Sequence, residues 1–312
     1  MMREVHLGFD IGGTASRWVA CNASGDVLTR GKVAGATGHI FNPAERQRLS
    51  NAFGAIAEAL SARNLQVVTV AGGMTGYGAA VEVEVKALIC EALPITPDRI
   101  RLIDDIVLAY LANFAPGEGH LISAGTGSIG VHVAADGVVI RVGGRGILID
   151  DAGSGSWIAL QALDQLYRAY DRNGNFDALR PLAECMFKAI GGNTWSDVRQ
   201  FVYAGDRGRI GTLSVAVAEA ALAGDATASD ILHRAGDELA GLAAALLIRC
   251  GEAPVGLVGG VLDLHPAILE RARRSLPGAV IVTNKGDAAL SAAQLHANSA
   301  WQSVFATGLK VP

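Results

Sequence analysis

The stretch Asp10-Ile11-Gly12-Gly13-Thr14-Ala15-Ser16-Arg17 follows the apolar run 5–9, and a second glycine loop, Ser123-Ala124-Gly125-Thr126-Gly127-Ser128, follows the apolar run 121–122. Each loop leads into another β-like run and not into a helix. Glycine lets backbone N–H groups approach an anion closely, and Ser and Thr hydroxyls add hydrogen-bond donors. Two such turns facing each other would hold the two ends of a polyphosphate.

An aspartate lies between the two loops in the sequence. Asp105 follows the apolar stretch 100–103, where a carboxylate beside phosphate-binding loops is placed to accept a proton from a hydroxyl. Either Asp104 or Asp105 could instead cap the helix expected to begin there. We assign the base to Asp105 and expect Asp104 to be its solvated neighbour.

The second loop also fits G-x-G-x-x-G, over Gly125 to Gly130, which is typical of dinucleotide-binding folds. That fold needs a helix directly after the glycines, whereas here Asp136-Gly137 separates two β-branched runs and predicts a hairpin. A Rossmann fold is therefore excluded. A P-loop is excluded as well, because the sequence has no G-x-x-x-x-G-K-[ST].

Composition indicates a cytoplasmic enzyme of two domains. The chain has 312 residues, half of them hydrophobic, with a net charge of −4 and 5% aromatic residues. These values favour neither a nucleic-acid nor a membrane partner. The four cysteines are far apart, which predicts free thiols rather than a metal knuckle or disulfides. We find neither a secretory segment nor a membrane-spanning one.

Hydrophobic periodicity predicts an α/β chain whose pattern restarts at residue 121. The first part is read as strands 5–9, 18–22 and 27–32, helix 43–63, strand 66–70, helix 80–93, strand 100–103 and helix 105–114. After a linker at 115–119 come strands 121–123, 129–134 and 138–142, a helical block over 156–250, strand 255–258, helix 266–275, strand 279–282 and helix 286–297. We place an N-terminal domain at 1–117, a C-terminal domain at 118–297 and a tail at 298–312.

Six motifs in order resemble the actin-like ATPase superfamily, and within it the N-acetylglucosamine kinase and BadF/BadG/BcrA/BcrD ATPase family. They are the two glycine loops, Asp105, Gly143-Gly144-x-Gly146, Asp151-x-Gly153-Ser154 and Gly259-Gly260. The resemblance covers nearly the whole chain. It implies two ribonuclease-H-like domains with a nucleotide cleft between them. It also implies an ATP-dependent kinase that phosphorylates a hydroxyl of an amino or N-acetylated hexose.

The resemblance also implies roles for particular residues. Asp10 would hold Mg²⁺ through water, and Asp105 would be the catalytic base. The expected ATP and phosphate contacts are Gly12, Gly13, Thr14, Arg17, Gly125, Thr126, Gly127, Ser128, Gly211, Gly259, Gly260 and Asp263. The expected sugar contacts are Thr126, Ser128, Gly144, Arg145, Gly146 and Asp151.

The chain departs from the family in the segments that would meet the sugar. Arg145 replaces a tryptophan, Ala152 replaces a glutamate, and the first sugar loop, residues 35–42, lacks the family's asparagine after Ser-Thr. Arg145 could face the pocket and bind a carboxylate, or it could face solvent or pair with Asp150 or Asp151. The sugar therefore stays open between an N-acetylated, an amino and an acidic one.

Two other functions compete with the kinase. The family also contains activators of dehydratases, which hold an iron–sulfur cluster between two subunits, but Cys90 and Cys185 lack a recognisable ligand spacing. A non-catalytic sugar sensor is the second, and the retained Asp105 argues against it. The oligomeric state is open, with a homodimer as one alternative.

Overall fold

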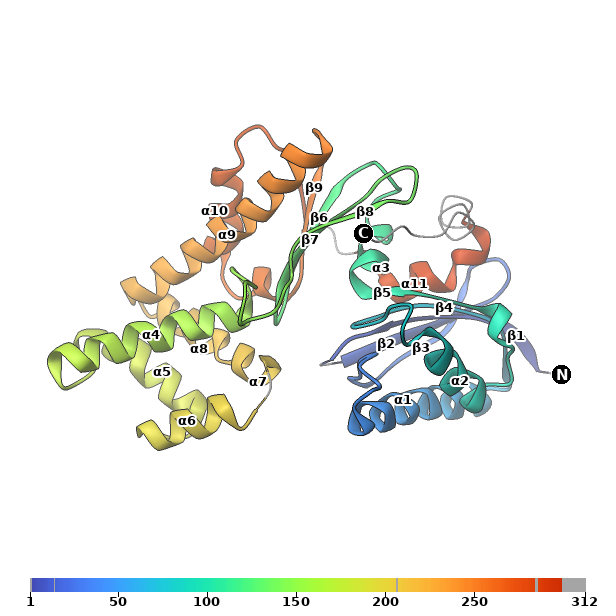
Figure 1. Cartoon of the computed structure of the whole chain (residues 1–312), viewed down its shortest axis with the longest axis horizontal. Helices are drawn as coiled ribbons and strands as arrows, with labels where there is room; N and C mark the ends of the chain where they lie inside the picture. Colours follow the sequence, from blue (N-terminus) through green and yellow to red (C-terminus); the bar gives the residue numbers. More distant parts are fainter. Residues whose placement is uncertain (1, 14, 206, 284–285, 299–312) are drawn as a thin grey trace. The chain divides into compact units, whose positions relative to one another are not determined.

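The computed structural model describes residues 2–13, 15–205, 207–283 and 286–298. They form two compact units, each built on a five-stranded sheet with helices packed on it (Figure 1). The first unit comprises the described residues within 1–118, 133–140 and 285–312, and the second those within 119–132 and 141–284. The predicted α/β class is confirmed.

The sheet of the first unit has the strand order β3-β2-β1-β4-β5. Its strands are β1 Arg3–Ile11, β2 Ala15–Cys21, β3 Val27–Ala34, β4 Leu65–Met74 and β5 Ile100–Asp104. The first three form antiparallel hairpins, whereas β4 runs parallel to both β1 and β5. Because β1, β4 and β5 are parallel, the residues at their carboxyl ends share one edge of the sheet.

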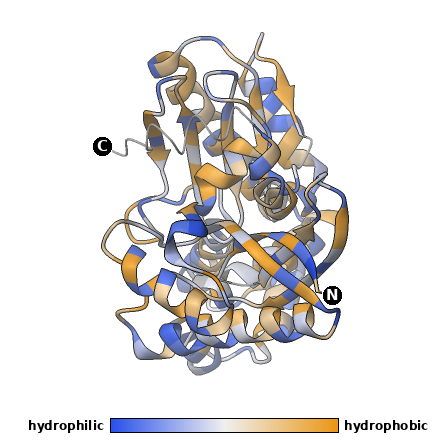
Figure 2. Cartoon of the chain, turned by 90° about the vertical axis from the view of Figure 1, so that its right-hand side faces the viewer, coloured by the Kyte–Doolittle hydropathy of each residue, from blue (hydrophilic) through white to orange (hydrophobic). Residues whose placement is uncertain are grey.

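Helices cover both faces of this sheet (Figure 1). On one face lie α1 Pro43–Ser61 and α2 Glu82–Ala92, and on the other α3 Asp105–Leu111 and α11 Ala288–Ala293. The predicted inward face of α1 is confirmed, since Leu49, Phe53, Ile56 and Leu60 are all buried. Figure 2 shows hydrophobic and hydrophilic residues mixed along the helices, as expected of helices with one buried face.

The first unit includes two segments that lie beyond the expected boundary at residue 117. The Val133 carbonyl accepts hydrogen bonds from the Gly117 N–H at 2.7 Å and the Tyr110 hydroxyl at 3.3 Å, which ties residues 133–140 to α3. α11 packs on β1 at Gly8, where a Cβ atom would lie 2.1 Å from the Ala289 carbonyl oxygen. Of the expected tail, only Asn298 lies within the described residues.

The sheet of the second unit has the order β10-β9-β6-β7-β8. Its strands are β6 His120–Ala124, β7 Ser128–Val133, β8 Val139–Gly143, β9 Val255–Val258 and β10 Ile281–Val282. β7 follows the second glycine loop directly, so the exclusion of a Rossmann fold is confirmed.

The described residues of the helical block in the second unit form six helices. They are α4 Gly155–Asn173, α5 Arg180–Ile190, α6 Trp195–Tyr203, α7 Arg207–Thr212, α8 Ser214–Leu222 and α9 Ala226–Cys250, and α10 Pro266–Ser275 follows β9. Short 3-10 turns occur at 97–99, 177–179, 260–263 and 295–297. Among the described residues, no helix combines the length and apolar character needed to cross a bilayer.

Candidate active site

Asp10 lies near the carboxyl end of β1, opposite Arg17 of β2 and beside Gly73 of β4. Burial first and the charge of Asp105 second raise the pKa of the Asp10 carboxyl to about 6, against an opposing effect of Arg17. A carboxyl group held in this way binds a cation or a proton readily, because either one relieves the cost of the buried charge.

Two carbonyl groups at the first glycine loop accept hydrogen bonds from neighbouring segments of the first unit. The Ile11 carbonyl accepts from the Thr75 N–H at 2.9 Å, and the Gly12 carbonyl accepts from the Ala36 N–H at 3.1 Å. In a trans peptide the N–H points opposite the C=O. The N–H groups of Gly12 and Gly13 therefore point away from these partners. Thr14, predicted to bind phosphate, lies outside the described residues.

Asp105 is the first residue of α3, and Asp104 is its N-cap. The Ile106 N–H donates to Asp104 Oδ1 at 3.2 Å and to Asp105 Oδ1 at 2.9 Å. The helix start lies close to β4 because position 73 is glycine: a Cβ there would lie 2.6 Å from Leu108 Cβ and 3.1 Å from Asp105 Cα. Gly73 is therefore the reason that the base candidate can approach the strand beside Asp10.

Sequence reasoning missed Thr75, which directly follows β4. Its hydroxyl donates to Asp105 Oδ2 at 2.5 Å. Its carbonyl accepts from the Gly38 N–H at 2.8 Å, so the loop 35–42 is bound to the residue that contacts Asp105. In that loop Asn42 caps α1 by accepting from the Ala44 N–H at 3.0 Å. No motif marks Thr75, and only the pairing of β4 with β5 reveals its partner.

The second glycine loop rests on the N-terminus of α4. The Gly155 N–H donates to the Gly125 carbonyl at 2.9 Å, and the Ser156 N–H donates to the Thr126 carbonyl at 3.3 Å. By the same trans-peptide geometry, the N–H groups of Thr126 and Gly127 point away from the helix. The positive end of the dipole of this 19-residue helix lies behind them, which favours an anion in front.

Asp151 lies against this loop. It is 2% exposed, has a left-handed backbone with φ 61°, and lies so close to Gly127 that a Cβ there would be 2.9 Å from Asp151 Oδ2. The buried Ser128 hydroxyl donates to the Ala152 carbonyl at 2.7 Å. The hydroxyl of Ser128 thus fixes the segment that carries Asp151.

The segment 143–150 brings Arg145 to Asp150. The Arg145 guanidinium lies 3.2 Å from Asp150 Oδ2, and its side chain is 62% exposed. Asp150 Oδ1 accepts from the backbone N–H of Arg145 at 2.7 Å and of Asp151 at 2.6 Å. Of the two arrangements left open by the sequence, the structure has the ion pair. Gly144 and Gly146 give this segment its turns, with φ 70° and 93°.

Gly211 and Gly259, two of the expected ATP contacts, lie beside the second glycine loop. A Cβ on Gly211 would lie 3.6 Å from Thr126 Cγ2. Gly259, with φ 108°, passes so close to the end of β6 that a Cβ would lie 2.2 Å from the Ala124 carbonyl oxygen. Gly260 and Asp263 follow in a 3-10 turn, and Asp263 is exposed.

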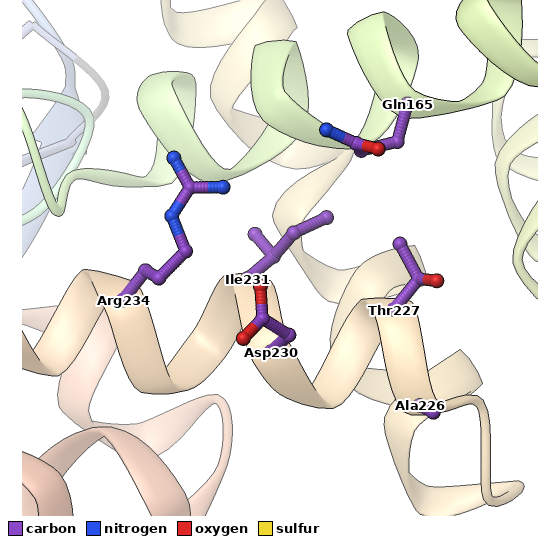
Figure 3. A pocket seen from close by; sticks show the side chains of 6 residues that line it. All are labelled: Gln165, Ala226, Thr227, Asp230, Ile231 and Arg234. Atoms are coloured by element: carbon purple, nitrogen blue, oxygen red, sulfur yellow. The ribbon is translucent and has the colours of Figure 1, made fainter.

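A separate hollow of about 290 Å³ lies between α4 and α9 and contains none of these residues. Figure 3 shows Gln165 on one side and Thr227, Asp230 and Arg234 on the other. Arg234 is engaged there by Gln161 Oε1 at 2.8 Å. Within the described part of the chain, no three His, Cys, Asp or Glu side chains gather as metal ligands.

Solved structures with the same fold include a candidate N-acetylglucosamine kinase and a glucokinase. A candidate N-acetylglucosamine kinase from Chromobacterium violaceum has a TM-score of 0.71 at 22% identity, with 95% of this chain and 100% of that one covered. A ROK family glucokinase from Streptomyces griseus, solved with glucose and AMPPNP, has a TM-score of 0.58 at 20% identity, with 93% and 98% covered. The two units therefore have the fold of the actin-like ATPases.

Residues 7–294 match the BadF/BadG/BcrA/BcrD ATPase family, and the chain belongs to that family. An N-acetylmuramic acid/N-acetylglucosamine kinase from Clostridium acetobutylicum is 25% identical over 204 residues, or 62% of this chain. The match spans 66% of the length of that relative.

Proposed function

We propose that the chain is an ATP-dependent kinase that phosphorylates a hydroxyl group of an amino or N-acetylated hexose. The observation that carries the proposal is the pair Asp10 and Asp105 at one edge of the first sheet, next to the amides of Gly12 and Gly13. One carboxyl group of such a pair suits a cation and the other suits a proton. The relatives named as sugar kinases support the same reaction class.

Asp105 accepts the proton of the sugar hydroxyl as the oxygen attacks the γ-phosphorus of ATP. The bond between the γ-phosphorus and the bridging oxygen breaks, and ADP leaves with the electron pair. A positioned base contributes roughly 10²–10⁴-fold to such a step. Because phosphoryl transfer needs little further covalent chemistry, the remaining residues act by binding and orienting the reactants.

The amides of Gly12, Gly13, Thr126 and Gly127 bind phosphate oxygens, and Gly259 and Gly260 adjoin the adenosine. The Asp10 carboxylate fits Mg²⁺, a cation that prefers oxygen ligands, because a nearby cation would offset the burial that raises the pKa of this group. Mg²⁺ bound with the nucleotide would neutralise phosphate charge. Asp10 would hold that cation through water.

Asp151, held by the segment 143–150, is the proposed sugar contact of the second unit. Since Asp150 pairs with Arg145, the guanidinium is not reserved for an acidic substrate, and the ion pair is compatible with a neutral N-acetylated hexose as well as with an acidic one. The name of the Clostridium relative covers both kinds of sugar. A homodimer and a cytoplasmic location remain predictions from the sequence.

The substitution Asp105→Asn tests the proposal. It removes the proton acceptor and leaves the shape, so kcat should fall by roughly 10²–10⁴-fold while the Kd for ATP changes little. The matched control is Asp104→Asn, because asparagine is as good an N-cap as aspartate. ADP release is measured with N-acetylglucosamine, glucosamine, N-acetylmuramic acid, glucose and sugar acids, and ATP binding by calorimetry. Unchanged turnover in Asp105→Asn, or a larger loss in Asp104→Asn, contradicts the assignment.

A further inference from the structure

Thr75 lies at a junction of three segments in the first unit. Its N–H donates to the Ile11 carbonyl at 2.9 Å, at the start of the first glycine loop. Its carbonyl accepts from Gly38 of the loop 35–42 at 2.8 Å, and its hydroxyl donates to Asp105 at 2.5 Å. The backbone N–H and C=O groups of Thr75 are therefore both held by hydrogen bonds, in addition to the hydroxyl that contacts the carboxylate.

The following glycine makes this junction tight. Gly76 has φ 76°, and a Cβ there would lie 2.6 Å from the His39 ring, so the loop 35–42 packs directly on this turn. On the other side, a Cβ on Gly38 would lie 2.9 Å from the Gly76 carbonyl oxygen. Two glycines thus bring the two loops into backbone contact, and Thr75 has little room to shift.

The carboxylate of Asp105 needs such a partner. The terminal torsion of an aspartate is broad, so a helix start alone does not fix where the two oxygens point. The Ile106 N–H holds Oδ1 at 2.9 Å, and the Thr75 hydroxyl holds Oδ2. A threonine is suited to this task because its branched side chain restricts its own χ1 torsion.

We propose that Thr75 is a positioning residue for the phosphoryl transfer: its hydroxyl fixes the orientation in which Asp105 meets the hydroxyl of the acceptor sugar. The inference rests on the proposed role of Asp105 as the base. Thr75 acts through Asp105, so removal of its hydroxyl should slow the transfer step without weakening nucleotide binding.

The test is a double-mutant cycle on the full chain. Thr75→Val keeps the branched shape and removes the donor, and we expect kcat to fall about 10- to 100-fold, as a small misplacement of a reacting group does. The KM for ATP should stay within about twofold, because an interaction that acts in the transfer step lowers kcat without weakening nucleotide binding. In the Asp105→Asn background, Thr75→Val should lower kcat by no more than about twofold, because the carboxylate through which Thr75 acts is already absent.

Two variants serve as controls. Thr75→Ser restores the donor and should return kcat to within about threefold of the parent, since a hydroxyl of either residue can make the bond. Thr69→Val removes a hydroxyl from the same strand, where it bonds to His6 at 2.7 Å, away from Asp105. It should leave kcat unchanged in both backgrounds. Thr75→Ala replaces Thr75→Val if circular dichroism shows that valine is not accommodated.

The outcomes separate this inference from the proposed function. If Asp105→Asn abolishes turnover and Thr75→Val does not lower kcat, only the positioning role fails. An equal loss in both backgrounds, or a Thr75→Ser variant as slow as Thr75→Val, also overturns it. If Asp105→Asn keeps its turnover, the base assignment fails, and the positioning role fails with it.

Discussion

At Gly127 a side chain would meet the carboxylate proposed to contact the sugar. A Cβ would lie 2.9 Å from Asp151 Oδ2 and 3.1 Å from Cγ, in a place where the Asp151 backbone is already left-handed and buried. Gly127→Val should therefore displace Asp151 and crowd the amides that face phosphate. We expect kcat/KM for both ATP and the sugar to fall by roughly 100-fold, the usual scale for a displacement of about 1 Å.

Steady-state kinetics with each substrate varied in turn checks this expectation. The matched control is Gly54→Ala in α1, where no atom other than the helix's own backbone and adjoining residues lies within 4 Å of the added Cβ and a helix gains from alanine. Thermal melting of both variants shows whether the fold is kept. A folded Gly127→Val variant with normal ATP binding would be incompatible with phosphate contacts from this loop.

Among the elements, the segment 143–150 depends on one carboxylate. Asp150 accepts the N–H groups of Arg145 and Asp151 and pairs with the Arg145 guanidinium, so it holds the turn that presents Asp151. Asp150→Ala should lower kcat/KM for every sugar by about tenfold or more, because hydrogen bonds to a charged group contribute about 1.5–3 kcal/mol each. Arg145→Ala removes only an exposed ion pair, which contributes about 0–1 kcal/mol.

The two variants are compared on the same panel of sugars. Asp150→Asn keeps one acceptor oxygen and should lie between the wild type and Asp150→Ala. Arg145→Ala should leave the ranking of the sugars unchanged. If Arg145→Ala lowers kcat/KM selectively for acidic sugars, the guanidinium binds the substrate, and pairing with Asp150 is not its main role.

Most elements could be predicted from the sequence because their signals are local. The inward face of α1 repeats every three to four residues, and the hairpin after the second glycine loop is marked by Asp136-Gly137. The two glycine loops are equally visible in the sequence, and their proposed contact with an anion stays a prediction, based on the close backbone approach that glycine allows.

What the sequence could not predict depends on contacts between distant elements. The periodicity of α11 predicts a helix but not the sheet it covers, which is set by the space at Gly8. Thr75 has no motif, and its bond to Asp105 exists because Gly73 admits α3 so close to β4. The pairing of Arg145 with Asp150 was one of several arrangements allowed by spacing alone.

For the molecule as a whole, the buried His120 and the half-buried Asp10 make stability depend on pH in opposite directions. In the second unit, burial lowers the pKa of the His120 ring, which lies 5.0 Å from His132. The unfolded chain therefore binds this proton more readily, and stability is lost as the pH falls below 6.5. In the first unit, Asp10 has a raised pKa, so stability is lost as the pH rises from 3.8 through about 6.

The substitution Asp10→Asn should consequently stabilise the protein while it removes activity. The pKa of this group rises from 3.8 to about 6, a shift of about 2 units, and each unit is about 1.4 kcal/mol, so the buried charge costs at most about 3 kcal/mol. At pH 8, without Mg²⁺ or nucleotide, we expect the free energy of unfolding to increase by roughly 1–3 kcal/mol. The gain should diminish between pH 6 and pH 3.8, where the folded wild type takes up its proton.

Urea unfolding at several pH values, followed by circular dichroism, measures the difference between the two proteins. Glu58→Gln is the matched control, because it neutralises an exposed carboxylate on α1 in the same unit and should leave stability within about 0.5 kcal/mol. If Asp10→Asn is less stable than the wild type at pH 8, the charge of Asp10 is satisfied in the folded protein without a cation. The case for a metal-binding carboxylate at the end of β1 would then be lost.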